Sequence, residues 1–196
     1  MTEIQYIKGD ATTPLAPPDS NRIIVHVCND IGGWGMGFVL AISRKWDEPE
    51  VAYRGYAQKC KEPFLRLGAV QLVQVEDSLW VANLIGQHKI GRPKNGGPPP
   101  IRYEAVRRGL KRVAEKAVVL GASVHMPRIG CGLAGGTWDV MGPIIEEELC
   151  ALDIPVTVYD YEPPVTKKRK ASSQPKQQHH TNQKSITEWA KPKTKS

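Results

Sequence analysis

Two glycine-rich loops hold the residues best suited to chemistry in this chain. The first reads CNDIGGWGMGF (residues 28–38) and the second PRIGCGLAGGTW (residues 127–138). Glycine adopts positive φ and lets backbone N–H groups approach an anion closely, and a helix that follows adds partial positive charge. One such loop is better explained by a tight turn, but two of them predict a phosphate site built from main-chain amides.

The known nucleotide fingerprints do not fit these loops. Phe38 stands where the pattern Gly-x-Gly-x-x-Gly, begun at Gly33, requires its last glycine, and the second loop contains no Gly-Lys-Ser/Thr. The sequence therefore supports neither a dinucleotide-binding Rossmann site nor a P-loop.

The elements that must position these loops alternate along the chain. Short Val/Ile-rich runs predict strands at residues 4–7, 22–28, 69–75, 79–85, 123–126 and 155–159. Apolar spacing predicts helices at 38–44, 49–60, 103–120 and 140–152, the last capped by Asp139 with Pro143 in its first turn. The alternation predicts an α/β fold with helices on both faces of the sheet, and ligands of such sheets bind beyond the strands' carboxyl ends.

Composition separates a folded part from a basic tail. Residues 163–196 carry nine of the 27 Lys and Arg residues and one of the 20 acidic residues, a balance of +8 that leaves −1 for residues 1–162. The tail is nearly devoid of apolar residues, so we expect one folded domain over 1–162 and disorder over 163–196.

The four cysteines form no Cys-x-x-Cys pair and indicate neither a metal site nor a disulfide framework. No cofactor is expected.

The sequence also contains no apolar run of about 20 residues that would cross a membrane. Its first residues, MTEIQYIKGD, lack the basic start and apolar middle of a secretory signal. We therefore expect no membrane partner and an intracellular location, nuclear in a eukaryote and cytoplasmic otherwise. A monomer is the expected state.

Three separated motifs together resemble one family. IKGDAT after the first predicted strand, VHVCNDIGGWGMGF at the second and MPRIGCGLAGGTW before the last helix resemble the macrodomains, whose members bind ADP-ribose. The resemblance covers about residues 3–162 and is strongest to the branch that contains the macrodomain of a chromatin remodeler and a terminal ADP-ribose glycohydrolase. It implies a three-layer α/β/α fold with a central mixed sheet.

The resemblance also implies roles for single positions. Asp10 would accept a hydrogen bond from the adenine amino group, and Tyr159 or Tyr161 would lie near adenine. Asn29 would contact the distal ribose, with Asp30 beside it. The loop residues implied to contact that ribose and the diphosphate are Gly33, Gly35, Gly37, Gly130, Cys131, Gly132, Leu133, Ala134 and Gly135.

Several of these residues have a plainer explanation. Asp10 is also suited to capping a turn before Thr12. His26 is a candidate general base, although a hydrogen-bonded strand histidine is the commoner case. Trp34 is as consistent with packing as with ligand contact, and Cys131 is a poor candidate for a nucleophile.

The glycohydrolase branch differs from this chain at its catalytic positions. A nucleophilic lysine and an aspartate of that branch align here with Gln87 and Ala134, so a covalent route is unsupported, although Lys89 is close in sequence. Hydrolysis by a water held between Asn29 or Asp30 and the ligand's own phosphate remains open.

The resulting expectation is a mono-ADP-ribosyl-protein hydrolase that releases ADP-ribose from acidic side chains. Two alternatives stay open, a non-enzymatic reader of ADP-ribosylated proteins and an ADP-ribose 1″-phosphate phosphatase that pairs His26 with an acid.

In the tail, TKKRK (166–170) resembles a nuclear-import signal, and Gln183, Ile186 and Trp189 have the spacing of a sliding-clamp box, whose second aromatic residue is absent. Together these two motifs favour a nuclear, DNA-repair setting.

Overall fold

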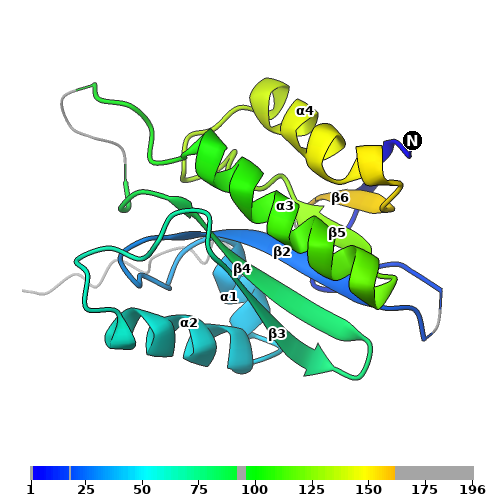
Figure 1. Ribbon diagram of the computed structural model, residues 1–196, viewed down its shortest axis with the longest axis horizontal. Helices are drawn as coiled ribbons and strands as arrows, with labels where there is room; N and C mark the ends of the chain where they lie inside the picture. Colours follow the sequence, from blue (N-terminus) through cyan, green and yellow to red (C-terminus); the bar gives the residue numbers. More distant parts are fainter. Residues whose placement is uncertain (1, 18, 92–95, 162–196) are drawn as a thin grey trace, which may run out of the picture. The chain divides into compact units, whose positions relative to one another are not determined.

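A computed structural model describes residues 2–17, 19–91 and 96–161 of the chain (Figure 1). All its helices and strands lie within one compact unit, Met1–Pro163. The predicted tail, with its basic run and clamp-like box, lies outside the described residues. Within the described part, no helix combines the length and the apolar character needed to cross a membrane.

The centre of the unit is a mixed sheet of six strands in the order β1-β6-β5-β2-β4-β3. Neighbouring strands run parallel except β3, which pairs antiparallel with β4. The strands are β1 (Ile4–Lys8), β2 (Arg22–Asn29), β3 (Val70–Glu76), β4 (Leu79–Gln87), β5 (Ser123–Pro127) and β6 (Val156–Asp160). Each overlaps a predicted strand, and the parallel ones send their carboxyl ends to one edge of the sheet.

Helices cover both faces of this sheet. They are α1 (Phe38–Ser43), α2 (Glu48–Lys59), α3 (Tyr103–Leu120) and α4 (Trp138–Glu148), followed by a short 3₁₀ turn at Cys150–Leu152. Figure 1 shows α3 and α4 on one side of the sheet and α1 and α2 on the other. The predicted three-layer α/β/α architecture is confirmed.

Strand β2 explains why two layers of helices are needed. Its residues are apolar on both faces: Ile23 and Val25 pack with Leu110 of α3, whereas Ile24 packs with Ile42 of α1. All five side chains are fully buried. A strand of this kind is stable only when both faces of the sheet are covered, as is typical of parallel sheets.

Helix α4 begins differently from the prediction. The expected cap at Asp139 is wrong, since Thr137 is the extended residue before the helix, which starts at Trp138. Asp139 lies in the first turn, and Pro143 lies inside the helix rather than in that turn. The start is fixed by a contact outside the helix, because the Thr137 amide donates to the Tyr103 hydroxyl at 2.9 Å.

Candidate functional site

A cleft of about 670 Å³ lies at the carboxyl ends of β2, β4 and β5. The strand ends contribute Asn29, Gln87 and Pro127, and the rest of the lining comes mainly from the two glycine loops. The loops lie against each other, since a Cβ on Gly37 would be 3.5 Å from a methyl carbon of Leu133. Chain segments about a hundred residues apart therefore form one site, as predicted for loops that follow parallel strands.

The cleft is supplied with backbone donors. Eight loop amides form no hydrogen bond with any other described residue, namely those of Trp34, Gly35, Met36, Gly37, Gly130, Gly132, Leu133 and Ala134. All eight residues line the cleft. Successive unpaired N–H groups in turns of this kind form concave sites for anions such as phosphate.

Two glycines of the second loop are required by the backbone itself. Gly130 has φ +70°, a conformation that other residues rarely adopt. Gly136 donates its amide to the carbonyl of Gly130 at 2.8 Å, and a Cβ on Gly136 would lie 2.7 Å from that carbonyl oxygen. The closed shape of the loop thus excludes a side chain at Gly136, a position that the sequence did not single out.

Asn29 shapes the first loop from inside. Its Oδ1 accepts hydrogen bonds from the amides of Gly33 (2.9 Å) and Ile31 (3.1 Å), and its Nδ2 donates to the Gly33 carbonyl at 2.6 Å. The Tyr53 hydroxyl adds a donor to Oδ1 at 2.9 Å. An amide nitrogen has two N–H groups, so one of them remains for a ligand in the cleft.

Asp30 is not part of the lining of the cleft. Its buried carboxylate accepts from His88 Nδ1 at 2.6 Å and from the Lys89 amide at 2.8 Å. Lys89 directs its ammonium group over the ring of Phe64, 5.5 Å from the centroid. Asp30 therefore ties the loop after β4 to the loop after β2, and neither Asp30 nor Lys89 faces the cleft.

His26 forms part of the floor of the cleft. Its Nε2 donates to Asn83 Oδ1 at 2.6 Å, and the amide of Asn83 is oriented by its own bond to the Pro49 carbonyl. Burial lowers the pKa of His26 to about 4, with the Asn83 bond opposing the shift. His26 is therefore neutral at pH 7, and its partner is an amide rather than the acid that the phosphatase alternative requires.

The positions expected near adenine lie outside the lining of the cleft. Asp10 caps a turn, since its Oδ1 accepts from both the amide and the hydroxyl of Thr12 at 2.8 Å. Tyr159 is buried, and its hydroxyl accepts from the Leu15 amide at 2.8 Å and bonds with His125 Nδ1 at 3.0 Å. Tyr159 therefore ties the segment after β1 to the sheet, whereas Asp10 stabilises a turn within that segment.

Cys131 and Gly135 also lie outside the lining, although their neighbours in the loop are part of it. Partial burial raises the pKa of the Cys131 thiol against the opposing effect of Arg128. A thiol with a raised pKa is a poor nucleophile, which agrees with the interpretation from the sequence.

Sequence reasoning missed Arg128, the one Lys or Arg among the described residues that line the cleft. The guanidinium donates to both carboxylate oxygens of Asp160, at 2.6 and 2.9 Å. It also lies over the rings of Trp138 (4.8 Å) and Tyr6 (5.2 Å). Its place directly after a strand and before a glycine loop was the available signal.

The described residues contain no cluster of three or more His, Cys, Asp or Glu side chains able to hold a metal ion. The described lining of the cleft offers a ligand main-chain N–H groups, the amide side chains of Asn29 and Gln87, and the guanidinium of Arg128. Such a donor set suits an elongated anion with hydroxyl groups, for example a diphosphate flanked by sugars.

Known proteins resemble this chain in sequence and in fold. A macrodomain protein from Streptomyces coelicolor is 52% identical, with a TM-score of 0.69, over 82% of this chain and 100% of that chain. A chromodomain-helicase-DNA-binding protein 1-like from Danio rerio is 34% identical over 82% of this chain, which spans only 16% of that protein. The ADP-ribose glycohydrolase OARD1 of Bos taurus is 27% identical over 81% of this chain and 91% of its own length.

No family model matches the sequence. The Streptomyces protein nevertheless combines high identity with coverage of its entire chain, and its fold is the one described above. Two of the three motifs that resembled the family in the sequence contain the loops that form the cleft. This chain therefore belongs to the macrodomain family.

Proposed function

We propose that this chain binds ADP-ribosyl groups in the cleft and hydrolyses the bond that joins them to acidic side chains. The observation that carries the proposal is the set of eight unpaired amides, contributed by two loops that face one cleft. A diphosphate presents acceptor oxygens to both loops at once. The name of the bovine relative, an ADP-ribose glycohydrolase, supports the same ligand.

The hydrolytic step needs no nucleophilic side chain. The two loops and Arg128 would hold the diphosphate, and the free N–H of Asn29 would orient the sugar at the end of the cleft. A water attacks the anomeric carbon, the ester C–O bond breaks, and the carboxylate leaves while the proton of the water passes to a ligand phosphate. Positioning of this kind supplies a large share of a barrier when the leaving group is good.

The second candidate is a reader that binds without turnover. It is favoured by the chemistry of the lining, which contains no Asp, Glu or Lys among the described residues. Gln87 and Ala134 occupy the positions where the resemblance to the glycohydrolase branch implies a lysine and an aspartate. A reader would bind the modified protein through the same amides and release nothing.

The full chain incubated with a glutamate-linked ADP-ribosylated protein separates the two candidates. Release of free ADP-ribose, measured by chromatography, supports hydrolysis, whereas calorimetric binding of ADP-ribose without release supports the reader. AMP and NAD serve as controls for recognition of the complete diphosphate and both sugars. Failure of ADP-ribose to bind would overturn both candidates.

For the tail, we infer an addressing role. The basic run at 166–170 and the box formed by Gln183, Ile186 and Trp189 support nuclear import and contact with a sliding clamp, in a DNA-damage setting, if the source is eukaryotic. In other organisms the location is cytoplasmic. In either setting the protein acts as a monomer. Replacing Ile186 and Trp189 by alanine should abolish co-purification with the clamp, and unchanged co-purification would exclude the box.

A further inference from the structure

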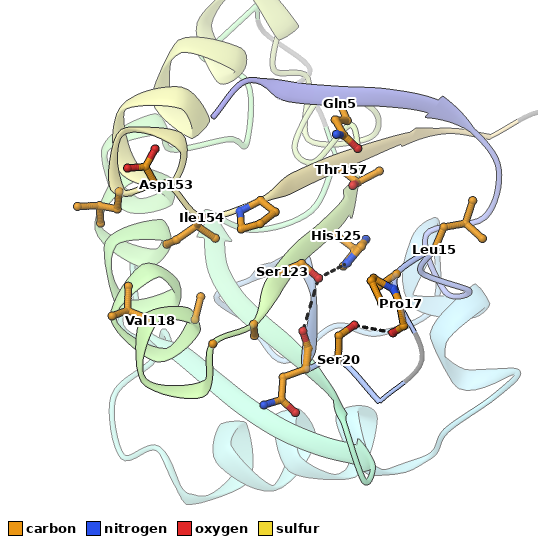
Figure 2. A pocket seen from close by; sticks show the side chains of 17 residues that line it. Gln5, Leu15, Pro17, Ser20, Val118, Ser123, His125, Asp153, Ile154 and Thr157 are labelled. Carbon is orange, nitrogen blue, oxygen red and sulfur yellow. Dashed lines mark hydrogen bonds between the residues drawn. The ribbon is translucent and has the colours of Figure 1, made fainter. Parts of the chain in front are cut away.

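A second pocket of about 530 Å³ lies on the face of the sheet that α1 and α2 leave uncovered, beside β5, β6 and β1. Its floor is a row of polar side chains, Gln5, Thr157, His125 and Ser123, and we name it the sheet-face pocket (Figure 2). It shares no lining residue with the cleft between the glycine loops. The proposed ADP-ribosyl site therefore does not account for it.

Strand register aligns the polar row. Gln5 of β1 pairs with Thr157 of β6, and Thr157 pairs with His125 of β5. Side chains at paired positions point to the same face, and neighbouring strands lie about 4.8 Å apart. Ser123 lies two residues before His125 and thus on the same face. The sheet therefore presents hydrogen-bonding groups at regular intervals along the floor of the pocket.

The side chains of this polar row differ in how many of their hydrogen-bonding groups already have a partner. His125 is occupied at both ring nitrogens, by Ser123 Oγ at 2.8 Å and by the Tyr159 hydroxyl at 3.0 Å. The Thr157 hydroxyl and the Gln5 amide make no hydrogen bond with another described residue. Thr157 is only 8% exposed, and it lines the pocket. The Thr157 hydroxyl is not sealed from solvent, since Gln71 Oε1 is the one sealed side-chain N or O atom without a partner among the described residues, so water or a ligand in the pocket can bond to it.

The walls of the pocket are mainly apolar. Val118 and Ala122, at the end of α3, stand on one side, and Leu15 and Pro17, in the segment after β1, stand on the other, as Figure 2 shows for the three that it labels. A ligand with apolar faces and a polar edge matches walls of this kind and a floor of hydroxyl and amide groups. Flat heteroaromatic rings with N–H and C=O groups at the edge have this form.

The charges of the lining residues restrict the class of ligand further. None of the described residues that line the pocket is Lys or Arg, and the one charged side chain among them is the carboxylate of Asp153. Burial, with a smaller contribution from Arg22, lowers the pKa of His125 to about 4, so this ring is neutral at pH 7. The described lining of this pocket thus supplies no cationic side chain to a phosphate, whereas the cleft offers its amides and Arg128.

We propose that the sheet-face pocket binds an uncharged nucleoside, with the edge of the base on Thr157 and Gln5 and its faces between the end of α3 and the segment after β1. Binding here is independent of the ADP-ribosyl cleft. The chain therefore carries two sites of opposite preference, one for a diphosphate and one for a neutral base.

Uridine and uridine 5′-monophosphate form the matched pair of probes, because they differ only by the phosphate. In amide NMR spectra of the ¹⁵N-labelled full chain, uridine is expected to shift the signals of Ser123, His125 and Thr157 and to leave those of Gly132 and Leu133 unchanged. The monophosphate is expected to bind the pocket more weakly than uridine. If uridine shifts only the cleft signals, or none, the proposal is overturned.

Two variants test the floor directly. Thr157→Val keeps the branched shape and removes the hydroxyl, and it should weaken uridine binding about fivefold, the equivalent of one net hydrogen bond. Gln5→Leu, at an exposed strand position where folding is not at risk, should have a similar effect. Thr13→Val makes the same chemical change outside the pocket and should leave the affinity unchanged. Unchanged affinity in both floor variants would exclude the assigned orientation of the base and with it the proposal.

Discussion

At the scale of single residues, the second glycine loop depends on a contact that leaves no room for a side chain. A Cβ at Gly136 would lie 2.7 Å from the Gly130 carbonyl oxygen, which also accepts the Gly136 amide. Gly136→Ala should therefore displace the loop, lower the free energy of unfolding by about 1–3 kcal/mol and weaken ADP-ribose binding at least about tenfold. Denaturant titration and calorimetry measure the two effects.

Gly55→Ala is the matched control, because Gly55 lies in α2 and a Cβ there would meet nothing within 4 Å. It should bind ADP-ribose normally and gain stability, since alanine is favoured over glycine in a helix by about 1 kcal/mol. An alanine at position 136 with normal affinity would show that the closed loop is not what presents the amides.

Functional residues could be predicted from the sequence where the pattern that marks them lies within a few neighbouring positions. The glycines that follow the strands predicted both loops, because glycine is the residue type that allows a positive φ and a close approach of the backbone. The partners of buried polar groups could not be found in this way. Asp30 meets His88, and His26 meets Asn83, across 58 and 57 positions of the chain. Only the pairing of β2 with β4 brings these residues together.

At the scale of elements, α2 supports the first loop although it contributes nothing to the lining of the cleft. Tyr53 is fully buried, and its hydroxyl shares its one hydrogen between the backbone oxygen of Asn29 at 2.6 Å and Oδ1 at 2.9 Å. Burial raises the pKa of Tyr53, so the hydroxyl stays a donor. Tyr53→Phe should cost about 1 kcal/mol of unfolding free energy and weaken ADP-ribose binding severalfold.

Tyr56→Phe is the control on the same helix, since the Tyr56 hydroxyl has no hydrogen-bond partner among the described residues. It should change neither stability nor affinity. Thermal unfolding and calorimetry of both variants provide the comparison. Equal behaviour of the two would mean that Asn29 holds its orientation without α2.

The boundaries of most elements were predictable because they rest on apolar periodicity. The helix predicted at 103–120 is α3 (Tyr103–Leu120), where the apolar stripe and the Gly121 cap agree. Helix α4 was placed two residues late because its start depends on Tyr103, a residue of another helix. Capping preferences describe only neighbouring residues, so they cannot predict a contact with a residue of another helix.

At the scale of the whole molecule, every described residue of the cleft lining lies between His26 and Ala134. Removing residues 163–196 should therefore leave the affinity for ADP-ribose unchanged while lowering the net charge at pH 7 from +7 to −1. Calorimetry at two salt concentrations measures this, because a contribution of the tail would depend on ionic strength. A large loss of affinity on truncation would contradict the division into a folded domain and a separate tail.

The stability of the molecule should fall as the pH is lowered from 7 to 5, because of two buried histidines. Burial lowers the pKa of both His26 and His125 to about 4, below the ordinary value of 6.5. Between these values the unfolded chain binds more protons than the folded one, so the free energy of unfolding decreases as the pH falls through this range.

The two histidines together set the size of this effect. Each pKa difference corresponds to about 3 kcal/mol over the full range from pH 6.5 to 4. Carboxylates with lowered pKa, such as that of Asp160, lose their contribution only at lower pH. Urea titrations at pH 7, 6 and 5 should thus show a steady loss, and His125→Gln should show about half of it. A free energy of unfolding that stays constant from pH 7 to 5 would mean that both rings reach solvent, and the floor of the cleft and that of the sheet-face pocket would then both be open.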